Sequence, residues 1–327
     1  MLRAHQKFFY LNDIFSLFLC LFFSISSFLN MGKLRLAWES LVTFSMDREL
    51  FYGLFFIFLI IILLLFYRWA NTSRRGVVQF LRLFYVQLLC GLFFKESIIL
   101  SQLFFNGRSF DPLFIQADQF LFHYQPAQQF HQALPNNPVI TELFFFGYFF
   151  YFFLVIVSFW LIYLKGKKRE AAHALLITTT SFYILYIFYT FFPVQGPKYF
   201  LPELNRIRYS NFDGLIITPL MQAIFKNMNL AGAAFPSSHV AISLIALLFN
   251  FKYNRSLAVL FLPFTLLLFF STIYIYAHYF VDVVGGILAG MALYFLVPLL
   301  LRLAAPGLRR IDLHLGGILK SAPIEGE

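Results

Sequence analysis

The sequence predicts an all-α integral membrane protein with about eight transmembrane helices. Hydrophobic residues make up 60% of the 327 residues and charged residues only 12%, whereas about a quarter of the residues in a soluble domain are charged. The apolar runs are continuous rather than alternating, which is typical of spanning helices and not of an outer-membrane barrel. The formal charge of +10 then indicates basic loops that face anionic membrane lipids, and we expect no nucleic-acid partner.

Eight apolar stretches carry this prediction. The predicted spans are residues 8–29, 50–67, 77–100, 139–164, 171–193, 236–251, 257–277 and 278–303. The first is interrupted by Asn12 and Asp13, but it lacks the small-residue cleavage site of a signal peptide, so we expect it to remain as a span. The third contains Arg82 and Glu96, so we expect it to face other helices rather than lipid.

Three connecting segments are too long for simple turns. Residues 30–49 are of mixed composition and suit a segment that lies at the membrane interface. Residues 101–138 are polar, and we expect them to lie on the surface. Residues 194–235 form a second long loop that contains Lys198, Arg206, Arg208 and Lys226.

No repeat or low-complexity linker divides the chain, so we expect one membrane domain over residues 1–327. Its expected parts are extra N-terminal helices (1–75), a helical catalytic core (76–303) and a cytoplasmic tail (304–327). The basic residues predict the orientation. With the N-terminus inside, the inside segments hold more Lys and Arg, over fewer residues, than the outside ones, so both termini are predicted to be cytoplasmic.

This topology brings distant polar residues to one membrane face. Lys198 follows the fifth span, His239 begins the sixth, and His278 begins the eighth. All three are therefore predicted at the non-cytoplasmic face, which is periplasmic or lumenal. Ionisable groups beside apolar spans are costly and mark a functional site by default.

His278 and Asp282 are four residues apart, so on a helix they would lie on one face. A carboxylate placed there accepts the Nδ1 proton of the imidazole and leaves Nε2 with its lone pair pointing outward. That arrangement orients a histidine as a nucleophile or base. The same pair also suits a polar bridge between two packed helices, so the spacing alone leaves both interpretations open.

A second cluster precedes the sixth span. Pro236 suits the first turn of a helix, and the amides and hydroxyls of Ser237 and Ser238 would form an anion site at its N-terminus. His239 would then be placed to give a proton to a leaving group. Taken alone, Pro-Ser-Ser is also an ordinary helix start, and Lys198 an ordinary interfacial lysine. Together, an anion site, a cation and two histidines at one face favour phosphoryl transfer.

The order and spacing of these motifs resemble those of a known family. Gly-Pro-Lys at 196–198, Phe-Pro-Ser-Ser-His at 235–239 and Ser-Thr-x5-His-Tyr-x-x-Asp at 271–282 resemble three blocks of the type 2 phosphatidic acid phosphatase superfamily. His-Tyr-Phe-Val-Asp, with Asp-x-x-Leu-Phe at 118–122 and Thr-Glu-Leu-Phe at 141–144, is similar to the inositol phosphorylceramide synthase (aureobasidin-resistance) branch.

The resemblance extends over roughly residues 110–295 and implies a six-helix phosphatase-type core preceded by two extra N-terminal helices. It implies that His278 attacks phosphorus and carries a phosphohistidine, that Asp282 orients it, and that His239 protonates the departing oxygen. The groups implied to hold the phosphate oxygens are Lys198, Ser237 and the backbone of Ser238. No metal and no other cofactor are expected.

The implied substrate is a phospholipid or lipid-phosphate ester. The branch favours transfer of a phosphoryl or phospho-head group to a lipid or polyol hydroxyl. Simple hydrolysis, of a phosphatidic acid or polyprenyl-phosphate type, is the alternative. Two positions depart from the superfamily pattern, because Thr272 and Asn205 stand where it usually has arginines. Arg206 and Arg208 are candidates to compensate.

Two other functions compete with lipid phosphoester chemistry. A proton-coupled transporter would use His239, His278 and Asp282 as a relay, but it would place polar groups through the depth of several spans rather than at one face. A metal-dependent hydrolase would use the same three residues as ligands. Sensitivity to a chelator distinguishes it from a phosphohistidine enzyme, which vanadate would inhibit.

Overall fold

The computed structural model describes residues 9–30, 48–73, 75–134, 137–201, 212–228, 231–314 and 319–320. Within these ranges the fold is helical, apart from one pair of two-residue parallel strands. The strands are β1 (Phe9–Tyr10) and β2 (Leu319–Lys320).

Seven of the described helices are long and apolar enough to cross a membrane. They are α1 (Leu11–Leu29), α2 (Arg48–Thr72), α3 (Gly76–Phe105), α6 (Pro138–Leu164), α7 (Lys168–Phe191), α12 (Arg255–Tyr274) and α13 (Phe280–His314). A shorter apolar helix, α11 (Ser238–Tyr253), runs between α7 and α12 in the chain. These eight helices coincide with the eight predicted spans, so the predicted fold class is confirmed.

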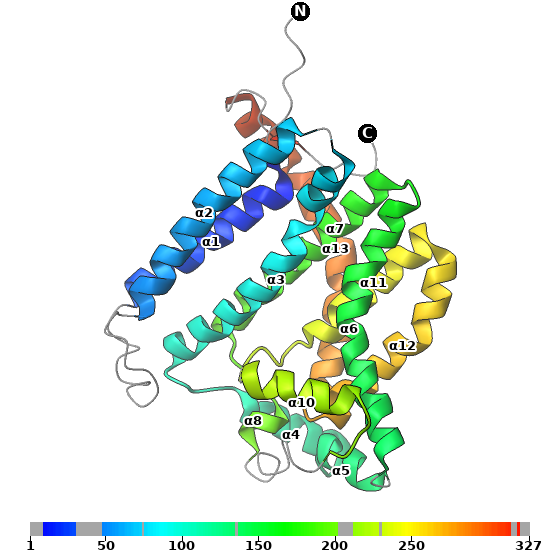
Figure 1. Cartoon of the computed structure of the whole chain (residues 1–327). Coiled ribbons are helices and arrows are strands. Elements are labelled where there is room, and N and C mark those ends of the chain that lie inside the picture. Colours follow the sequence, from blue (N-terminus) through cyan, green and yellow to red (C-terminus); the bar gives the residue numbers. More distant parts are fainter. Residues whose placement is uncertain are drawn as a thin grey trace, which may run out of the picture.

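The spanning helices form one bundle with a hairpin at its side (Figure 1). α11 lies at the centre, because it packs against α6, α7, α12 and α13. α1 and α2 pack along each other as the hairpin, and α1 also contacts α3 and α7. The six helices from α3 onward therefore make the core, and the two N-terminal helices cover one side of it.

The short helices gather at one end of the bundle (Figure 1). They are α4 (Asp111–Phe122), α5 (Pro126–Ala133), α8 (Pro197–Phe200) and α10 (Ile217–Met228). α4 and α5 belong to the polar segment 101–138, which was expected on the surface, and α8 and α10 belong to the second long loop, 194–235. Most of residues 30–49, the expected interfacial segment, lie outside the described residues.

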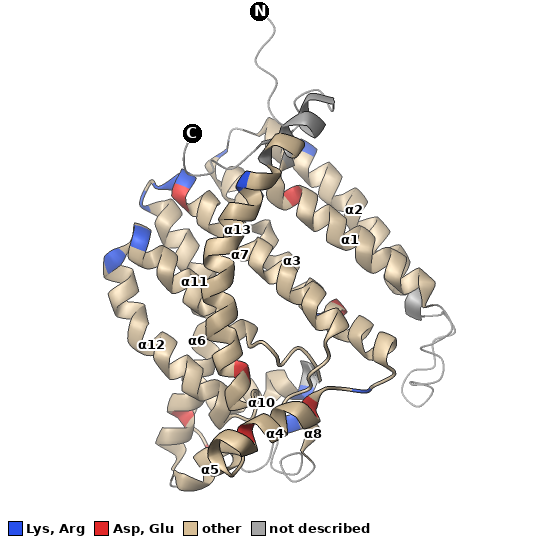
Figure 2. Ribbon diagram, turned by 180° about the vertical axis from the view of Figure 1, so that it is seen from behind, with Lys and Arg blue, Asp and Glu red and all other residues tan. Residues whose placement is uncertain are grey.

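The opposite end carries the start of α1, the paired strands and the basic turns (Figure 2). The basic residues there are Lys165 and Lys167 after α6, Lys252 in the last turn of α11, and Arg255 at the start of α12. The basic turns and the short helices therefore lie at opposite ends of the bundle.

The last helix begins later than the sequence suggests. α12 ends at Tyr274 and α13 begins at Phe280, and Tyr276 in the turn between them has a φ of 59°. His278 therefore lies in this turn and not on the last span. The expectation that His278 and Asp282 stack along one helix is wrong, since only Asp282 is helical. α13 also continues to His314, past the expected start of the tail at residue 304.

A buried ion pair ties the N-terminal hairpin to the core. Arg82 of α3 donates from both terminal nitrogens to the carboxylate of Asp13 in α1, with Nη1 2.8 Å from Oδ1. The two side chains are 1% and 0% exposed. The Tyr85 hydroxyl also donates to Asp13, and the Tyr67 ring centroid lies 4.4 Å from the guanidinium carbon. The polar residues that interrupt these spans thus face other helices, as expected.

Arg82→Met is expected to destabilise the protein by about 3–5 kcal/mol, because it leaves the Asp13 carboxylate buried and uncompensated. The measurement is denaturant or thermal unfolding in detergent. The matched control is Arg68→Met at the exposed end of α2, where the expected change is within about 0.5 kcal/mol. Equal losses for the two variants would show that the buried pair does not hold the hairpin to the core.

Candidate active site

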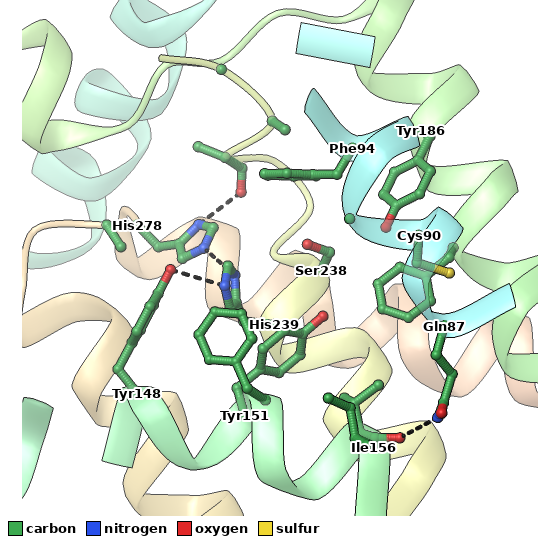
Figure 3. Close-up of a pocket in the computed structure, with 18 of the residues that line it drawn as sticks. Gln87, Cys90, Phe94, Tyr148, Tyr151, Ile156, Tyr186, Ser238, His239 and His278 are labelled. Carbon is green, nitrogen blue, oxygen red and sulfur yellow. Dashed lines mark hydrogen bonds between the residues drawn. The ribbon is translucent and has the colours of Figure 1, made fainter. Parts of the chain in front are cut away.

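A cavity of about 270 Å³ lies between α3, α6 and α7 and reaches the turns that precede α11 and α13 (Figure 3). One part is lined mainly by aromatic and aliphatic side chains of the bundle. They include Cys90, Phe94, Tyr151, Val155, Phe159, Leu175 and Phe182. The part near the turns is lined by polar and aromatic residues, namely Gln195, Lys198, Tyr199, Phe225, Ser238, His239 and His278. An apolar cavity with polar groups at one end is the usual form of a ligand site.

The two histidines meet in this cavity. Nε2 of His278 lies 3.5 Å from Nδ1 of His239, and the ring centroids are 5.6 Å apart. Nδ1 of His278 lies 2.8 Å from the carbonyl oxygen of Ala234 and 3.4 Å from Oδ2 of Asp282. The closer partner of Nδ1 is thus a backbone carbonyl, and not the carboxylate on which the sequence prediction relied.

The Ala234 carbonyl fixes the protonation pattern of His278. A carbonyl oxygen only accepts hydrogen bonds, so Nδ1 of His278 carries the proton and donates it. Nε2 then keeps its lone pair and faces the cavity, which is the form of histidine that can attack phosphorus.

Asp282 supports this arrangement from the first turn of α13. Its Oδ2 accepts the amide of Tyr279 at 2.9 Å, and its own backbone oxygen accepts the amide of Ser237 at 3.1 Å. Asp282 therefore caps α13 and links the two turns, in addition to lying beside Nδ1 of His278.

The N-terminus of α11 presents His239 to the cavity. The Ser237 hydroxyl accepts the Val240 amide at 3.4 Å as the N-cap of the helix, and Ser237 is fully buried. Ser238 and not Ser237 lines the cavity. The first intrahelical bond runs from Ala241 to Ser237, so the amides of Ser238 and His239 precede it and have no acceptor within the helix.

The Lys198 loop packs directly on the His278 turn. The Lys198 amide donates to the Tyr276 carbonyl at 3.0 Å. Gly196 has a φ of 91°, and a Cβ at this position would lie 2.6 Å from the Ala277 oxygen. Only glycine allows both this conformation and this approach. Nζ of Lys198 lies 4.4 Å from the ring centroid of Phe225, at the edge of the cavity.

Two carboxylates of α4 hold these loops, and sequence reasoning gave neither a role. Asp111 accepts the amides of Gln195 and Gly196, each at 2.8 Å, and the Tyr279 hydroxyl at 2.9 Å. It thereby joins the Lys198 loop to the turn that carries the nucleophile candidate. No local pattern singles out Asp111 in the sequence.

Asp118 lies two helical turns after Asp111 on α4 and accepts the amides of Phe280 and Val281 at 3.0 and 3.1 Å. These amides open α13 and have no partner within the helix. Burial raises the pKa of the Asp118 carboxyl from its ordinary value, and the two amide donors oppose that shift. Its place in the Asp-x-x-Leu-Phe motif was the only sequence signal for it.

Of the two positions that depart from the superfamily pattern, the structure describes Thr272 but not Asn205. Thr272 contributes its backbone, because its carbonyl accepts the amides of Ala277 and His278 while its hydroxyl bonds to Phe269. Asn205, Arg206 and Arg208 lie outside the described residues. Within the described ranges, Lys198 is the only Lys or Arg that lines the cavity.

The environment keeps His278 uncharged. Burial, together with the positive charge of Lys198, lowers the pKa of the imidazole to about 3, while the hydrogen bond to Ala234 opposes the shift. The ordinary pKa of histidine in an unfolded chain is about 6.5. Between about pH 3 and 6.5, His278 therefore takes up a proton when the protein unfolds. The stability contributed by neutral His278 is complete above about pH 6.5 and is lost as the pH falls toward 3.

The neutral state of His278 is directly measurable. In protein labelled with ¹⁵N-histidine, we expect the His278 nitrogens to show no titration midpoint between pH 5 and 8, because the pKa lies at about 3. Lys198→Met should raise that pKa, since it removes a nearby positive charge. Lys226→Met, at the exposed end of α10, is the control and should leave it unchanged. A midpoint near 6.5 in the unaltered protein would contradict this account.

Comparison with known proteins identifies one family. The model of the PAP2 superfamily matches residues 114–296, which is more than half of the chain and includes Lys198, His239 and His278. No curated protein and no solved structure gave a significant match. The match reaches the superfamily and does not single out the inositol phosphorylceramide synthase branch.

Proposed function

Because this chain belongs to the PAP2 superfamily, we propose that it is a membrane-embedded lipid phosphotransferase that works through a phosphohistidine on His278. One observation carries the proposal. The lone pair of Nε2 of His278 faces the cavity, 3.5 Å from a second imidazole and beside the cavity's lysine. A nucleophile, an acid and a cation at one point are what transfer of a phosphoryl group requires.

The shape of the cavity supports a lipid substrate. Its polar end holds Lys198 and the amides that begin α11, while the rest is lined mainly by aromatic and aliphatic side chains of three spanning helices. A lipid phosphoester matches this distribution when its phosphate lies at the polar end and a hydrocarbon chain occupies the apolar part.

The first half-reaction uses the two histidines in opposite roles. The Nε2 lone pair of His278 forms a bond to phosphorus, and the bond between phosphorus and the ester oxygen breaks. The electron pair leaves with that oxygen, which takes a proton from Nδ1 of protonated His239, so that neutral His239 remains. Lys198 and the amides of Ser238 and His239 stabilise the charge on the phosphate oxygens.

The second half-reaction regenerates His278. A hydroxyl attacks the phosphohistidine and passes its proton to Nδ1 of His239. Water as the attacking group gives hydrolysis, and a lipid or polyol alcohol gives transfer. The similarity of residues 118–122, 141–144 and 278–282 to the inositol phosphorylceramide synthase branch favours transfer. Hydrolysis of a phosphatidic acid or polyprenyl phosphate shares the first half-reaction and is the second candidate.

The orientation belongs to the same proposal. The site lies at the end of the bundle that carries α4, α5, α8 and α10, and the basic turns lie at the opposite end (Figure 2). With those turns in the cytoplasm, the site faces the periplasm or lumen and both termini are cytoplasmic. Its titratable groups then lie at one membrane face, which favours an enzyme over a proton relay through the bilayer.

His278→Ala is expected to abolish turnover, with a loss of about 10⁴-fold or more, because it removes the nucleophile. His239→Ala is expected to lower turnover about 10²–10⁴-fold, because it removes the acid. The assay uses purified protein in micelles with labelled lipid phosphoesters, with and without ceramide. Free phosphate reports hydrolysis, and a new phosphodiester reports transfer.

The control is His173→Ala, at the other end of the bundle, which should retain turnover per folded molecule. Full activity in both site variants would overturn the mechanism. Loss of activity in chelator that a divalent metal restores would favour a metal-dependent hydrolase, whereas inhibition by vanadate without any metal supports the phosphohistidine.

A further inference from the structure

Tyr148 of α6 contacts the second histidine of the site. Its hydroxyl lies 2.9 Å from Nε2 of His239, and the two ring centroids are 4.7 Å apart (Figure 3). Tyr148 is 6% exposed and lines the cavity. In the sequence it is one of many aromatic residues of an apolar span, and neither the motifs nor the family pattern assigns it a role.

The direction of the hydrogen bonds follows from a single carbonyl. Since the Ala234 oxygen only accepts, Nδ1 of His278 donates to it and Nε2 of His278 accepts. The nitrogen that faces Nε2 of His278, at 3.5 Å, is Nδ1 of His239. Two lone pairs facing each other would repel, so the favoured tautomer of His239 carries its proton on Nδ1. Nε2 of neutral His239 is then the acceptor, and the Tyr148 hydroxyl donates to it. Before substrate binds, this chain of bonds favours one tautomer of each imidazole.

We propose that Tyr148 is a positioning residue that keeps the proton of His239 on Nδ1, the nitrogen that faces the nucleophile candidate and from which the leaving oxygen would be protonated. The proposal rests on the function proposed above, in which His239 is the acid. A hydroxyl both donates and accepts, so Tyr148 serves His239 in its neutral and its protonated form.

Tyr148 can hydrogen-bond to His239 at each proton transfer of the two half-reactions. When the negatively charged phosphate binds, His239 takes up a proton from solvent at Nε2, and the Tyr148 hydroxyl turns to accept that N–H. Nδ1 then gives its proton to the leaving oxygen as the bond from phosphorus breaks. Neutral His239 remains, with Nε2–H held by Tyr148 and a lone pair on Nδ1. That lone pair takes the proton of the hydroxyl that attacks in the second half-reaction.

The packing of α6 fixes where the Tyr148 hydroxyl lies. A Cβ at Gly147 would lie 2.3 Å from Oγ of Ser271 and 2.7 Å from Cγ of Leu267, so α6 approaches α12 as closely as a glycine permits. Tyr151, one turn further along, also contacts His239, with a centroid distance of 4.5 Å and the ring planes tilted by 50°. Only Tyr148 of these two tyrosines is hydrogen-bonded to the imidazole in the described part of the chain.

The test compares two leaving groups in Tyr148→Phe. One substrate is an alkyl phosphoester, whose alkoxide needs a proton to leave. The other is the matching p-nitrophenyl ester, whose phenolate leaves without one. The readout is the rate of phosphohistidine formation in a single turnover. We expect the alkyl ester to react at least tenfold more slowly in the variant and the p-nitrophenyl ester to change less than twofold.

Two further variants separate this role from a structural one. Tyr253→Phe removes a similar bond, 3.2 Å from the Tyr253 hydroxyl to Nδ1 of His173, at the other end of the bundle, and should leave both rates unchanged. Tyr151→Phe should not alter the ratio of the two rates. A Tyr148→Phe variant that slows both esters equally, or neither, would overturn the proposal.

The same substrates also test the function on which the proposal rests. His278→Ala should form no phosphohistidine from either ester. Phosphohistidine formation in His278→Ala would rule out the proposed function itself. An equal effect of Tyr148→Phe on both esters would rule out only the proposed role of Tyr148.

Discussion

The hydrogen bond from Nδ1 of His278 to the Ala234 carbonyl joins two turns that are 44 residues apart in the chain. It determines which nitrogen of His278 carries the proton, and so which nitrogen can react. The same bond sets the tautomer of His239 and the direction of its bond from Tyr148. Because a carbonyl cannot donate, this pattern does not depend on the charge of Asp282. One backbone interaction therefore establishes a nucleophile and an acid whose reactive nitrogens face each other.

That bond requires the two turns to stay together, and two carboxylates of α4 stabilise the segments around them. Asp111 and Asp118 accept four backbone amides and one tyrosine hydroxyl from the Lys198 loop and from the start of α13. A hydrogen bond to a charged acceptor contributes about 1.5–3 kcal/mol, and a buried amide left without a partner is costly. The polar segment between α3 and α6 is thus part of the site, although it crosses no membrane.

The sequence was sufficient for the spans and for the convergence of Lys198, His239 and His278. Apolar length reports spanning helices directly, and alternation of the chain across the bilayer puts these three residues at one face. Other features of the site could not be predicted from the sequence, because they depend on tertiary contacts. Asp111 finds its amide partners 84 and 85 residues away, and Tyr148 looks like any aromatic residue of α6. The spacing of His278 and Asp282 is that of two residues on one face of a helix. His278 nevertheless lies in the turn before α13, and only Asp282 is helical.

The most direct test of this account is the position of the phosphoryl group on the trapped enzyme. After rapid quenching of protein labelled with ¹⁵N-histidine, mass spectrometry locates the modified residue and NMR identifies the modified nitrogen. We expect phosphorus on Nε2 of His278, since Nδ1 is hydrogen-bonded to the Ala234 carbonyl. Phosphorus on Nδ1 of His278, or on His239, would contradict the hydrogen-bond pattern from which the mechanism is derived.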